Sequence, residues 1–417
     1  MAISHPNEDK GNYYRSLYAK YIARSQNTYT PTQVVVEKAQ GVYLWTVDGR
    51  RLVDFTSGVL VCNLGYAHPK FESKFKDYYG QLPRNAYNMT SPVQIEASRR
   101  LIESFGYSKA QKILWAASGS EGVQKAMWTV LARYRDRNII VATRYGFHGK
   151  KGLAADVSGD KSSNPNVRFI SFPMGEGYGK DYYERELQQL WESYPGKIAL
   201  LITEPYLGSR GSYHPPKWYH QLLQQWCNEH DIPFIFDEVQ ACFGRTGNMY
   251  AFQTYDVEPD LVVLGKGMAN GEPASAVVGR EDLIESLDYS EASDTFSGST
   301  SACCAVCATM DVFEEDRIVE HVKKVEGILS EVLQKLKERF PFILEVRGEG
   351  MVYGMDCTNS EIANRCILEA YYGTGDEGVN IMGALAKKVL RVSPPLIITE
   401  EEIRHAYEIL VSAWSRI

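Results

Sequence analysis

Short, continuous apolar runs recur through the middle of the chain and are rich in β-branched residues. They are ILWAA (113–117), NIIVAT (138–143), VRFISF (167–172), ALLIT (199–203), FIFDEV (234–239), LVVLG (261–265) and SAVVG (275–279). Strands with one solvated face alternate apolar and polar residues, whereas strands covered on both faces are apolar throughout. The runs therefore predict the strands of a sheet that is buried on both sides.

Segments with helical periodicity lie between these runs. Residues 120–134 carry apolar side chains at steps of three and four, among them Val123, Met127 and Val130, which is the spacing of a helix with one buried face. The segment 215–230, between ALLIT and FIFDEV, shows a similar stripe. A strand–helix–strand order favours parallel strands. We therefore predict an α/β fold, with a mainly parallel sheet and helices on both faces.

The two ends of the chain follow a different pattern. VYLWTVDGRRLVDF (42–55) predicts two short strands around Asp48-Gly49, a dipeptide that is typical of hairpin turns. The C-terminal part predicts a long amphipathic helix, short strands and a last helix. The predicted domains are a large one, 58–305, and a smaller α+β one built from both chain ends, 1–57 and 306–417.

The composition excludes several classes of function. The chain has 417 residues and a net charge of −7, without a block of Lys or Arg, which argues against a nucleic-acid partner. No apolar run approaches the roughly 18–20 residues that span a bilayer. The first residues lack the charged and then apolar pattern of a secretory signal. We expect a cytoplasmic protein with neither a nucleic-acid nor a membrane partner.

The eight cysteines are scattered, apart from Cys303, Cys304 and Cys307. A Cys-x-x-Cys pair occurs in metal and redox sites, but this one lies in STSACCAVCATM, a run of small residues with helical character and no second Cys/His pair nearby. A chain of this length also needs no disulfides to be stable. We interpret the three cysteines as packing residues in a reducing compartment, and we expect no metal site.

Charged residues stand at the ends of two predicted strands. Asp237 ends the apolar part of FIFDEV, at the edge of an α/β sheet where ligands bind; its neighbour Glu238 is expected to face away and form a salt bridge. Lys266 follows the next strand, 29 residues after Asp237. A buried carboxylate needs a cation or an N–H group as partner, and a desolvated lysine is a nucleophile suited to Schiff-base formation. A structural ion pair is the alternative interpretation of Asp237.

Two further motifs belong to the same predicted edge. SGSEG (118–122) leads from a strand into the 120–134 helix, whose N-terminal N–H groups and dipole favour an anion; the alternative is that Ser120 only caps the helix. Phe147 either stacks on a flat ring or packs in the core. A phosphate turn, an aromatic ring, a carboxylate and a lysine together predict pyridoxal 5′-phosphate (PLP) as the cofactor.

Motifs along nearly the whole chain carry a family resemblance. They are DGRRLVDFTSG, GYAHPK, SGSEG, FHGK, ITEPY, DEVQACFGRTG, LGKGMANG, TFSG, EVRGEGMVYGMD and LRVSPPLIIT. In this order they resemble the class III (ω-amino-acid type) aminotransferases of the fold-type-I PLP enzymes. The resemblance implies a homodimer with shared active sites. It also implies ping-pong transfer of an amino group from an ω-amino acid or primary amine to a keto acid, either pyruvate or 2-oxoglutarate.

The resemblance also implies roles for single residues. Lys266 would bind PLP as a Schiff base and shuttle a proton, and Asp237 would hold the pyridine N–H. The implied cofactor-binding residues are Gly119, Ser120, Phe147, His148, Glu204, Asp237, Val239, Gln240, Lys266 and Thr295, the last of which would reach the phosphate in the neighbouring subunit. Arg391 would bind the substrate carboxylate, with an ordinary ion pair as the alternative.

The sequence departs from the family pattern at two places. Many members read E-P-x-x-G-E where this chain reads EPYLGSR, so that Ser209 replaces a glutamate that pairs with the arginine. This puts 2-oxoglutarate in doubt and makes pyruvate an option. SGST (297–300) replaces the usual G-G-N-P. The same scaffold also serves PLP-dependent 2,1-aminomutases and amino-acid racemases, which remain the alternative; a non-catalytic binding protein is the least favoured interpretation.

Overall fold

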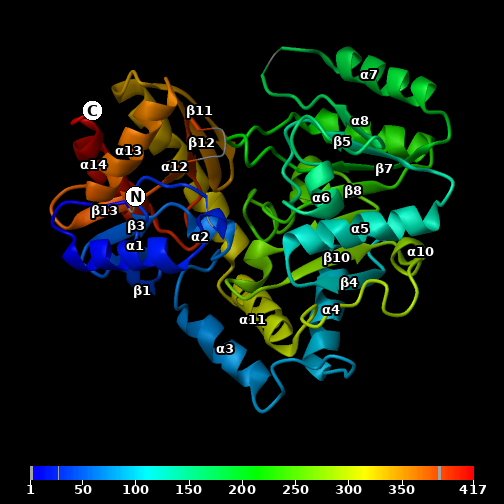
Figure 1. Cartoon of the computed structure of the whole chain (residues 1–417), viewed down its shortest axis with the longest axis horizontal. Helices are drawn as coiled ribbons and strands as arrows, with labels where there is room; N and C mark the ends of the chain where they lie inside the picture. The colour runs from blue at the N-terminus through cyan, green and yellow to red at the C-terminus, as the bar shows by residue number, and fades with distance from the viewer. Residues whose placement is uncertain (1–2, 27, 176, 384–386) are drawn as a thin grey trace. The chain divides into compact units, whose positions relative to one another are not determined.

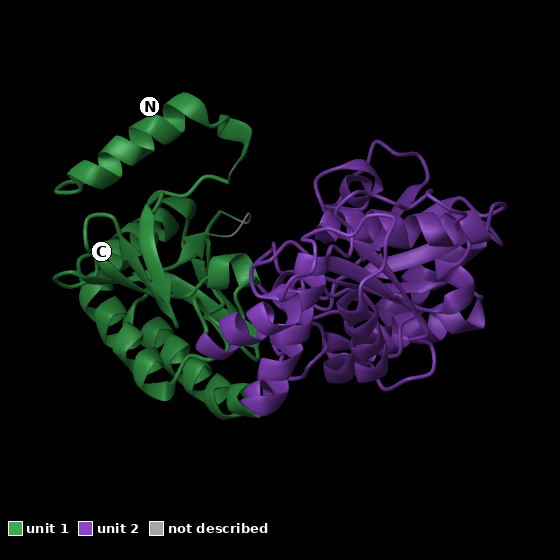
Figure 2. Ribbon diagram, turned by 90° about the horizontal axis from the view of Figure 1, so that it is seen from below, with its two compact units in different colours: residues 1–68, 320–417 green, residues 69–319 purple. Residues whose placement is uncertain are grey.

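The computed structural model describes residues 3–26, 28–175, 177–383 and 387–417, with the order of elements shown in Figure 1. Two compact units are formed (Figure 2). The smaller unit combines residues 3–68 with 320–417, and the larger unit comprises residues 69–319.

The larger unit is built on a seven-stranded sheet of order β4-β10-β9-β8-β7-β5-β6. The strands are β4 (Lys112–Ala116), β5 (Ile139–Thr143), β6 (Val167–Ile170), β7 (Ile198–Thr203), β8 (Phe234–Asp237), β9 (Leu261–Leu264) and β10 (Ser275–Gly279). β10 is antiparallel to both of its neighbours, and the other pairs are parallel. Every residue of β5, β7, β8, β9 and β10 is buried. The predicted buried, mainly parallel sheet is confirmed.

The larger unit also contains helices (Figure 1). They are α3 (Pro69–Tyr79), α4 (Pro92–Ser104), α5 (Gly119–Arg133), α6 (Gly152–Asp156), α7 (Lys180–Ser193), α8 (Lys217–Glu229), α9 (Ala251–Tyr255), α10 (Glu281–Ile284), α11 (Thr300–Glu315) and the short 3₁₀ helix η2 (Lys266–Ala269). α5 packs against β4, β9 and β10, and α8 packs against β8. No described helix combines the length and the apolar character that crossing a bilayer requires.

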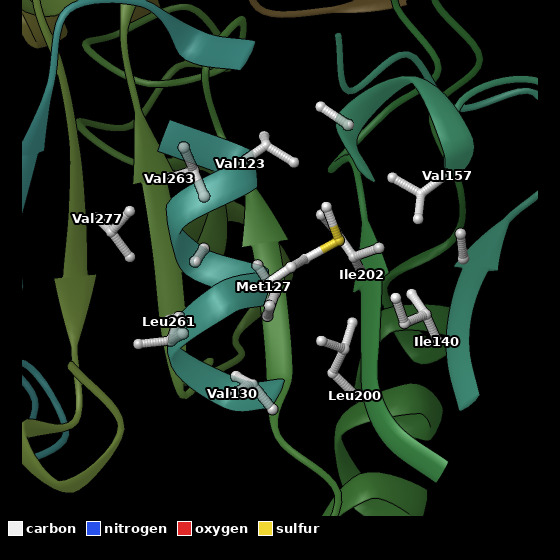
Figure 3. Close-up of a cluster of buried hydrophobic side chains, with 14 of the residues drawn as sticks. Val123, Met127, Val130, Ile140, Val157, Leu200, Ile202, Leu261, Val263 and Val277 are labelled. Carbon is white, nitrogen blue, oxygen red and sulfur yellow. The ribbon is translucent and has the colours of Figure 1, made fainter. Parts of the chain in front are cut away.

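The apolar face of α5 forms a core with the sheet (Figure 3). Its predicted stripe, Val123, Met127 and Val130, is fully buried. The strand residues packed in the same cluster include Ile140, Leu200, Ile202, Leu261, Val263 and Val277. Because this packing fixes the helix on the sheet, it also fixes where the first turn of α5 lies at the sheet's edge.

The three clustered cysteines lie in α11, where all are buried, and α11 packs against α3 and α4. Their interpretation as packing residues is confirmed. The same packing keeps α11 in the larger unit, which therefore extends to residue 319. The domain limits of 58 and 305 stay predictions.

The smaller unit contains two four-stranded sheets. One is formed by β1 (Val36–Gln40), β2 (Tyr43–Thr46), β3 (Arg51–Asp54) and β13 (Glu377–Asn380), and the other by β11 (Ile343–Glu349), β12 (Val352–Cys357), β15 (Val389–Val392) and β14 (Met382–Gly383). β2 and β3 form the predicted hairpin. β13 pairs with β3 in parallel, so both ends of the chain share one sheet.

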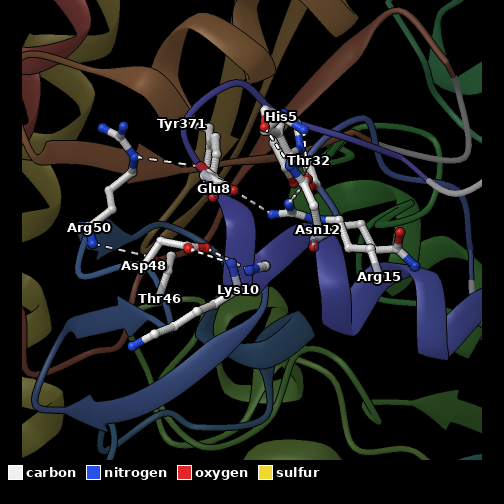
Figure 4. Close-up of polar contacts among 12 residues, drawn as sticks. His5, Glu8, Lys10, Asn12, Arg15, Thr32, Thr46, Asp48, Arg50 and Tyr371 are labelled. Atoms are coloured by element: carbon white, nitrogen blue, oxygen red, sulfur yellow. Dashed lines mark hydrogen bonds and ion pairs between the residues drawn. The ribbon is translucent and has the colours of Figure 1, made fainter.

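The helices of the smaller unit are α1 (Asp9–Tyr21), η1 (Arg24–Gln26), α2 (Ser57–Leu60), α12 (Ile318–Arg339), which begins at the junction of the two units, α13 (Ser360–Tyr372) and α14 (Glu400–Trp414). Polar contacts fasten α1 (Figure 4). Buried Glu8 accepts hydrogen bonds from Arg15 Nη2 and from the hydroxyl of Tyr371, both at 2.7 Å. Asp48 accepts from the first backbone N–H groups of the helix at 3.1 and 2.8 Å. Hydrogen bonds to two carboxylates thus tie the N-terminal helix to α13 and to the β2–β3 turn.

We expect Leu200→Ala to lower the free energy of unfolding by about 2–5 kcal/mol, because it leaves a cavity in the fully buried core between α5 and the sheet. Urea unfolding of the apoprotein measures the change. Leu344→Ala is the matched control: Leu344 is 52% exposed, and its truncation should change stability by less than about 0.5 kcal/mol. Equal losses in the two variants would contradict the assigned core.

Candidate active site

A cavity of about 180 Å³ lies within the larger unit. Its lining residues are Ser118, Gly119, Ser120, Phe147, His148, Gly149, Glu204, Asp237, Val239, Gln240 and Lys266. These residues stand at or shortly after the carboxyl ends of β4, β5, β7, β8 and β9, all of which point to the same edge of the sheet. Ligands of open α/β sheets bind at this edge. The structure thus brings together nine of the residues that the sequence predicted.

The first turn of α5 forms one wall of the cavity. Ser118 is the N-cap: its hydroxyl accepts from Glu121 N at 3.4 Å, and the Glu121 carboxylate accepts from Ser118 N at 3.1 Å. The alternative in which Ser120 caps the helix is therefore wrong, and Ser120 lies inside the first turn, where it lines the cavity. N–H groups at the start of a helix have no partner within the helix and attract anions.

Close backbone approach explains the glycines around this turn. A Cβ on Gly119 would lie 2.6 Å from Val239 Cγ1, and a Cβ on Gly149 would lie 2.6 Å from Ser120 Oγ. Neither position has room for a side chain. Ser118 and Gly149 also line the cavity, but they were not predicted from the sequence as site residues. Ser118 belongs to the motif SGSEG, and Gly149 belongs to the motif FHGK.

Asp237 is buried at the end of β8 and has two hydrogen-bond donors. His148 Nδ1 lies 2.7 Å from its Oδ2, and Val239 N donates to Oδ1 at 3.1 Å. Burial acts to lower the pKa of His148, but the hydrogen bond and charge of Asp237 and the charge of Glu204 outweigh it and raise that pKa. Asp237 therefore has an ion-pair partner, as its alternative interpretation expected, and also faces the cavity.

Glu204 follows β7 and binds the backbone of the segment that contains Phe147. Its Oε2 accepts from the backbone N–H of Phe147 at 2.8 Å. Burial raises the pKa of Glu204 to about 7, although the charge of His148 acts in the opposite direction. This contact fixes the backbone at Phe147, whose side chain lines the cavity.

Lys266 follows β9, the strand next to β8, and lines the same cavity as Asp237. It is half-buried. Its φ of 44° lies in the left-handed region, which is unfavourable for a residue with a side chain by roughly 1–2 kcal/mol. Lys266 therefore has an unfavourable backbone conformation, which the surrounding packing has to enforce.

The prediction that Glu238 forms a salt bridge is wrong. The side chain is fully buried, has no ion-pair partner among the described residues, and accepts from the backbone N–H groups of Ala251 at 2.7 Å and Phe252 at 2.6 Å. Burial raises its pKa to about 8. Glu238 thus satisfies the amides at the start of α9, where those N–H groups have no partner within the helix.

Two of the predicted site residues lie elsewhere. Thr295 is exposed in the loop before α11, where its carbonyl accepts from Asn85 Nδ2 at 2.7 Å. Arg391 belongs to the smaller unit and is buried in β15. Their roles toward cofactor and substrate stay predictions.

Two residues that line the cavity, His148 and Gln240, each carry a buried polar atom without a partner among the described residues. The atoms are His148 Nε2 and Gln240 Oε1, whereas buried polar atoms are normally paired. The cavity also combines a helix N-terminus, a paired carboxylate, an aromatic ring and an amine. PLP needs a phosphate site, an anion for its ring nitrogen and an imine-forming lysine, so the residues present fit this cofactor.

Comparison with known proteins agrees with this geometry. The chain belongs to the family described as aminotransferase class-III, which it matches over residues 24–414. Acetylornithine aminotransferase of Methanocaldococcus jannaschii is 30% identical over 380 residues, which cover 89% of this chain and 90% of that protein. A probable 4-aminobutyrate aminotransferase of Bacillus subtilis is 27% identical over 397 residues, covering 89% and 91%.

Solved structures show the same fold. Acetylornithine aminotransferase from Elizabethkingia anophelis superposes with a TM-score of 0.84 at 25% identity, over 98% of this chain and 99% of that one. A PLP-bound amine transaminase from an uncultivated Pseudomonas species superposes with a TM-score of 0.86 at 24% identity, over 95% and 98%. The predictions of fold, family, cofactor and aminotransferase activity are confirmed. This chain is a class III aminotransferase, a PLP-dependent enzyme that transfers amino groups.

We expect the apoprotein to lose stability relative to Glu204→Gln as the pH rises from 4.5, the ordinary pKa of this carboxyl, to about 7. In this window folded Glu204 keeps a proton that the unfolded chain has released, so rising pH favours unfolding. Across this window the free energy of unfolding of the wild type should fall by about 3 kcal/mol relative to that of Glu204→Gln. Urea unfolding at a series of pH values measures it, with Glu103→Gln, at an exposed site, as control. A difference that does not change with pH would contradict the assignment.

Proposed function

We propose that this cavity is the active site of an aminotransferase that takes an amino group from an ω-amino acid or primary amine and passes it to a keto acid. The observation that carries the proposal is the placement of Lys266 and Asp237, at the ends of the adjacent strands β9 and β8, in the wall of one cavity. An amine and a carboxylate in this arrangement meet the two main needs of PLP chemistry.

When bound, PLP supplies a carbonyl carbon that captures amines and a ring that accepts the electron pair released at the substrate Cα. In our proposal the Nζ of Lys266 binds the cofactor at rest. The free Nζ would move a proton between the substrate Cα and the cofactor's carbonyl carbon. Asp237 keeps the ring nitrogen protonated, and His148 holds the Asp237 carboxylate in position. Charge that develops in the transition state is thereby stabilised by groups already in place.

The remaining lining residues have binding roles in this proposal. Gly119 and Ser120, in the first turn of α5, hold the phosphate. Phe147 and Val239 contact the ring, and Gln240 contacts the ring oxygen. Support for these roles comes from their common cavity and from the close fit of Gly119 against Val239.

The proposal includes a homodimer with shared active sites in the cytoplasm. Near Thr295 the larger unit exposes Tyr87, Met89 and Phe296 by 46%, 65% and 64%. The hydroxyl of Tyr87 lies 3.3 Å from Ser293 Oγ, so these residues belong to neighbouring segments. Grouped exposed apolar residues are typical of interfaces. The cysteines are all free thiols, which agrees with a reducing compartment.

The partner substrates are proposed by class only. The relatives named above act on 4-aminobutyrate or acetylornithine, both amines that also carry a carboxylate. Arg391 is the proposed ligand of that carboxylate. Ser209 stands where many family members have the glutamate that pairs with this arginine, and we therefore include pyruvate beside 2-oxoglutarate as the acceptor.

We expect Lys266→Ala to lower turnover at least about a hundredfold, because the group that moves the proton is lost. Reduction with borohydride followed by peptide mapping should find the cofactor attached to residue 266 in the wild type and absent there in the variant. Lys112→Ala, at an exposed lysine, is the control and should behave as the wild type. Full turnover in Lys266→Ala would refute the assignment.

A single amine supplied without any keto acid separates transamination from isomerisation. We expect the enzyme to complete one half-reaction per active site and then stop, because the amino group has no acceptor. Adding pyruvate or 2-oxoglutarate should restart turnover, and the ratio of the two rates identifies the acceptor. Absorbance spectroscopy and quantification of the keto product follow both stages. Continued turnover of the single amine would favour an aminomutase or a racemase instead.

A further inference from the structure

Lys125 lies in the second turn of α5 and is only 4% exposed. Its Nζ donates to the carbonyl of Trp115 at 2.8 Å, to Asp294 Oδ2 at 2.7 Å and to Ser297 Oγ at 2.9 Å. All three protons of the ammonium group are therefore used. A buried ammonium without partners would be strongly unfavourable, so this lysine firmly joins α5 to the two segments that supply its acceptors.

One of these segments is a tight turn, Asp294–Ser297, built around the Asp294 carboxylate. Ser297 donates from its backbone N–H to Oδ1 at 2.9 Å and from its hydroxyl to Oδ2 at 2.5 Å. The two residues at the tip, Thr295 and Phe296, are exposed. Lys125 thus holds the base of a turn that presents Thr295 to its surroundings.

The second segment is the end of β4, which leads into the phosphate-binding turn. Gly298, directly after the Asp294–Ser297 turn, has φ +62°, and a Cβ there would lie 2.8 Å from Trp115 Cγ. The chain after the turn therefore packs on Trp115, whose carbonyl Lys125 also binds. Ser118, at the start of the phosphate turn, lies three residues after Trp115 in the chain. A single lysine connects the Asp294–Ser297 turn to both elements that flank the phosphate turn.

We propose that Lys125 is a positioning residue for cofactor binding. It orders the Asp294–Ser297 turn, so that Thr295 is already in place to meet the phosphate of the cofactor in the neighbouring subunit. The inference rests on the proposed function, a homodimer with shared active sites, and on the phosphate contact that the family resemblance implies for Thr295. A group that is ordered before binding loses less conformational entropy on binding and so binds more tightly. Ser297 stands where this chain departs from the family's G-G-N-P. Its hydroxyl accepts from Lys125 Nζ and donates to Asp294, so it takes part in ordering the turn.

A double-mutant cycle tests this inference. PLP is titrated into apoprotein and followed by tryptophan fluorescence for the wild type, Lys125→Met, Thr295→Ala and the double variant. We expect Thr295→Ala to weaken PLP binding about tenfold, as for one lost hydrogen bond to a charged group, and Lys125→Met to weaken it by a smaller factor. Because Lys125 acts through Thr295, the double variant should bind no more weakly than Thr295→Ala alone.

The outcomes separate the inference from the function on which it rests. Losses that multiply in the double variant would overturn the role of Lys125 and leave that of Thr295 intact. Unchanged affinity in Thr295→Ala would overturn both. If Lys125→Met does not fold, Ser297→Ala completes the same cycle. It removes the hydroxyl that Lys125 binds, while the Lys125–Asp294 ion pair stays in place. Lys112→Met, at an exposed lysine paired with Glu281 and Glu285, is the matched control and should bind PLP as the wild type does.

Discussion

A charge is stable inside a protein only when it is paired, and this constraint shapes the active site and its surroundings. Asp237 is paired with His148, and Lys125 is paired with Asp294. Glu204 is buried near His148 and Asp237, where burial raises its pKa, and it accepts a backbone N–H. In each case the partner comes from a different strand, helix or loop. The pairings therefore decide how these elements meet, and with that the shape of the cavity.

The apolar core supplies the rigidity that such pairing needs. α5 carries the phosphate turn at its N-terminus and Lys125 one turn further on, while its opposite face is packed against the sheet. A helix held in this way cannot adjust its first turn independently of the strands. Groups held in place before the reaction stabilise developing charge without first having to reorganise. In the proposed function, packing that is remote from the cavity thereby contributes to the chemistry inside it.

Asp237 and Glu238 show how one strand end serves two purposes. Successive side chains of a strand point to opposite faces, so that one carboxyl faces the cavity and its neighbour faces the protein interior. Asp237 is hydrogen-bonded to a histidine, whereas Glu238 accepts only from backbone N–H groups. Burial raises the pKa of Glu238 to about 8, because these amides compensate its desolvation less than a cation would. Chemically similar neighbours thus differ because of what faces them.

The sequence by itself determined the strands, the stripe of α5 and the order of the motifs, because apolar periodicity and local turn chemistry are properties of neighbouring residues. It also placed Asp237 and Lys266 at one sheet edge, since consecutive parallel strands end on the same side. Only the tertiary structure decided that Ser118 rather than Ser120 caps α5, that Glu238 binds backbone amides, and that Lys125 reaches Asp294. The Lys125–Asp294 contact joins residues 169 positions apart, and the choice between the two serines depends on the residue at which the helix begins. Neither composition nor periodicity records such long-range partners, because they form only when the packed elements bring them together.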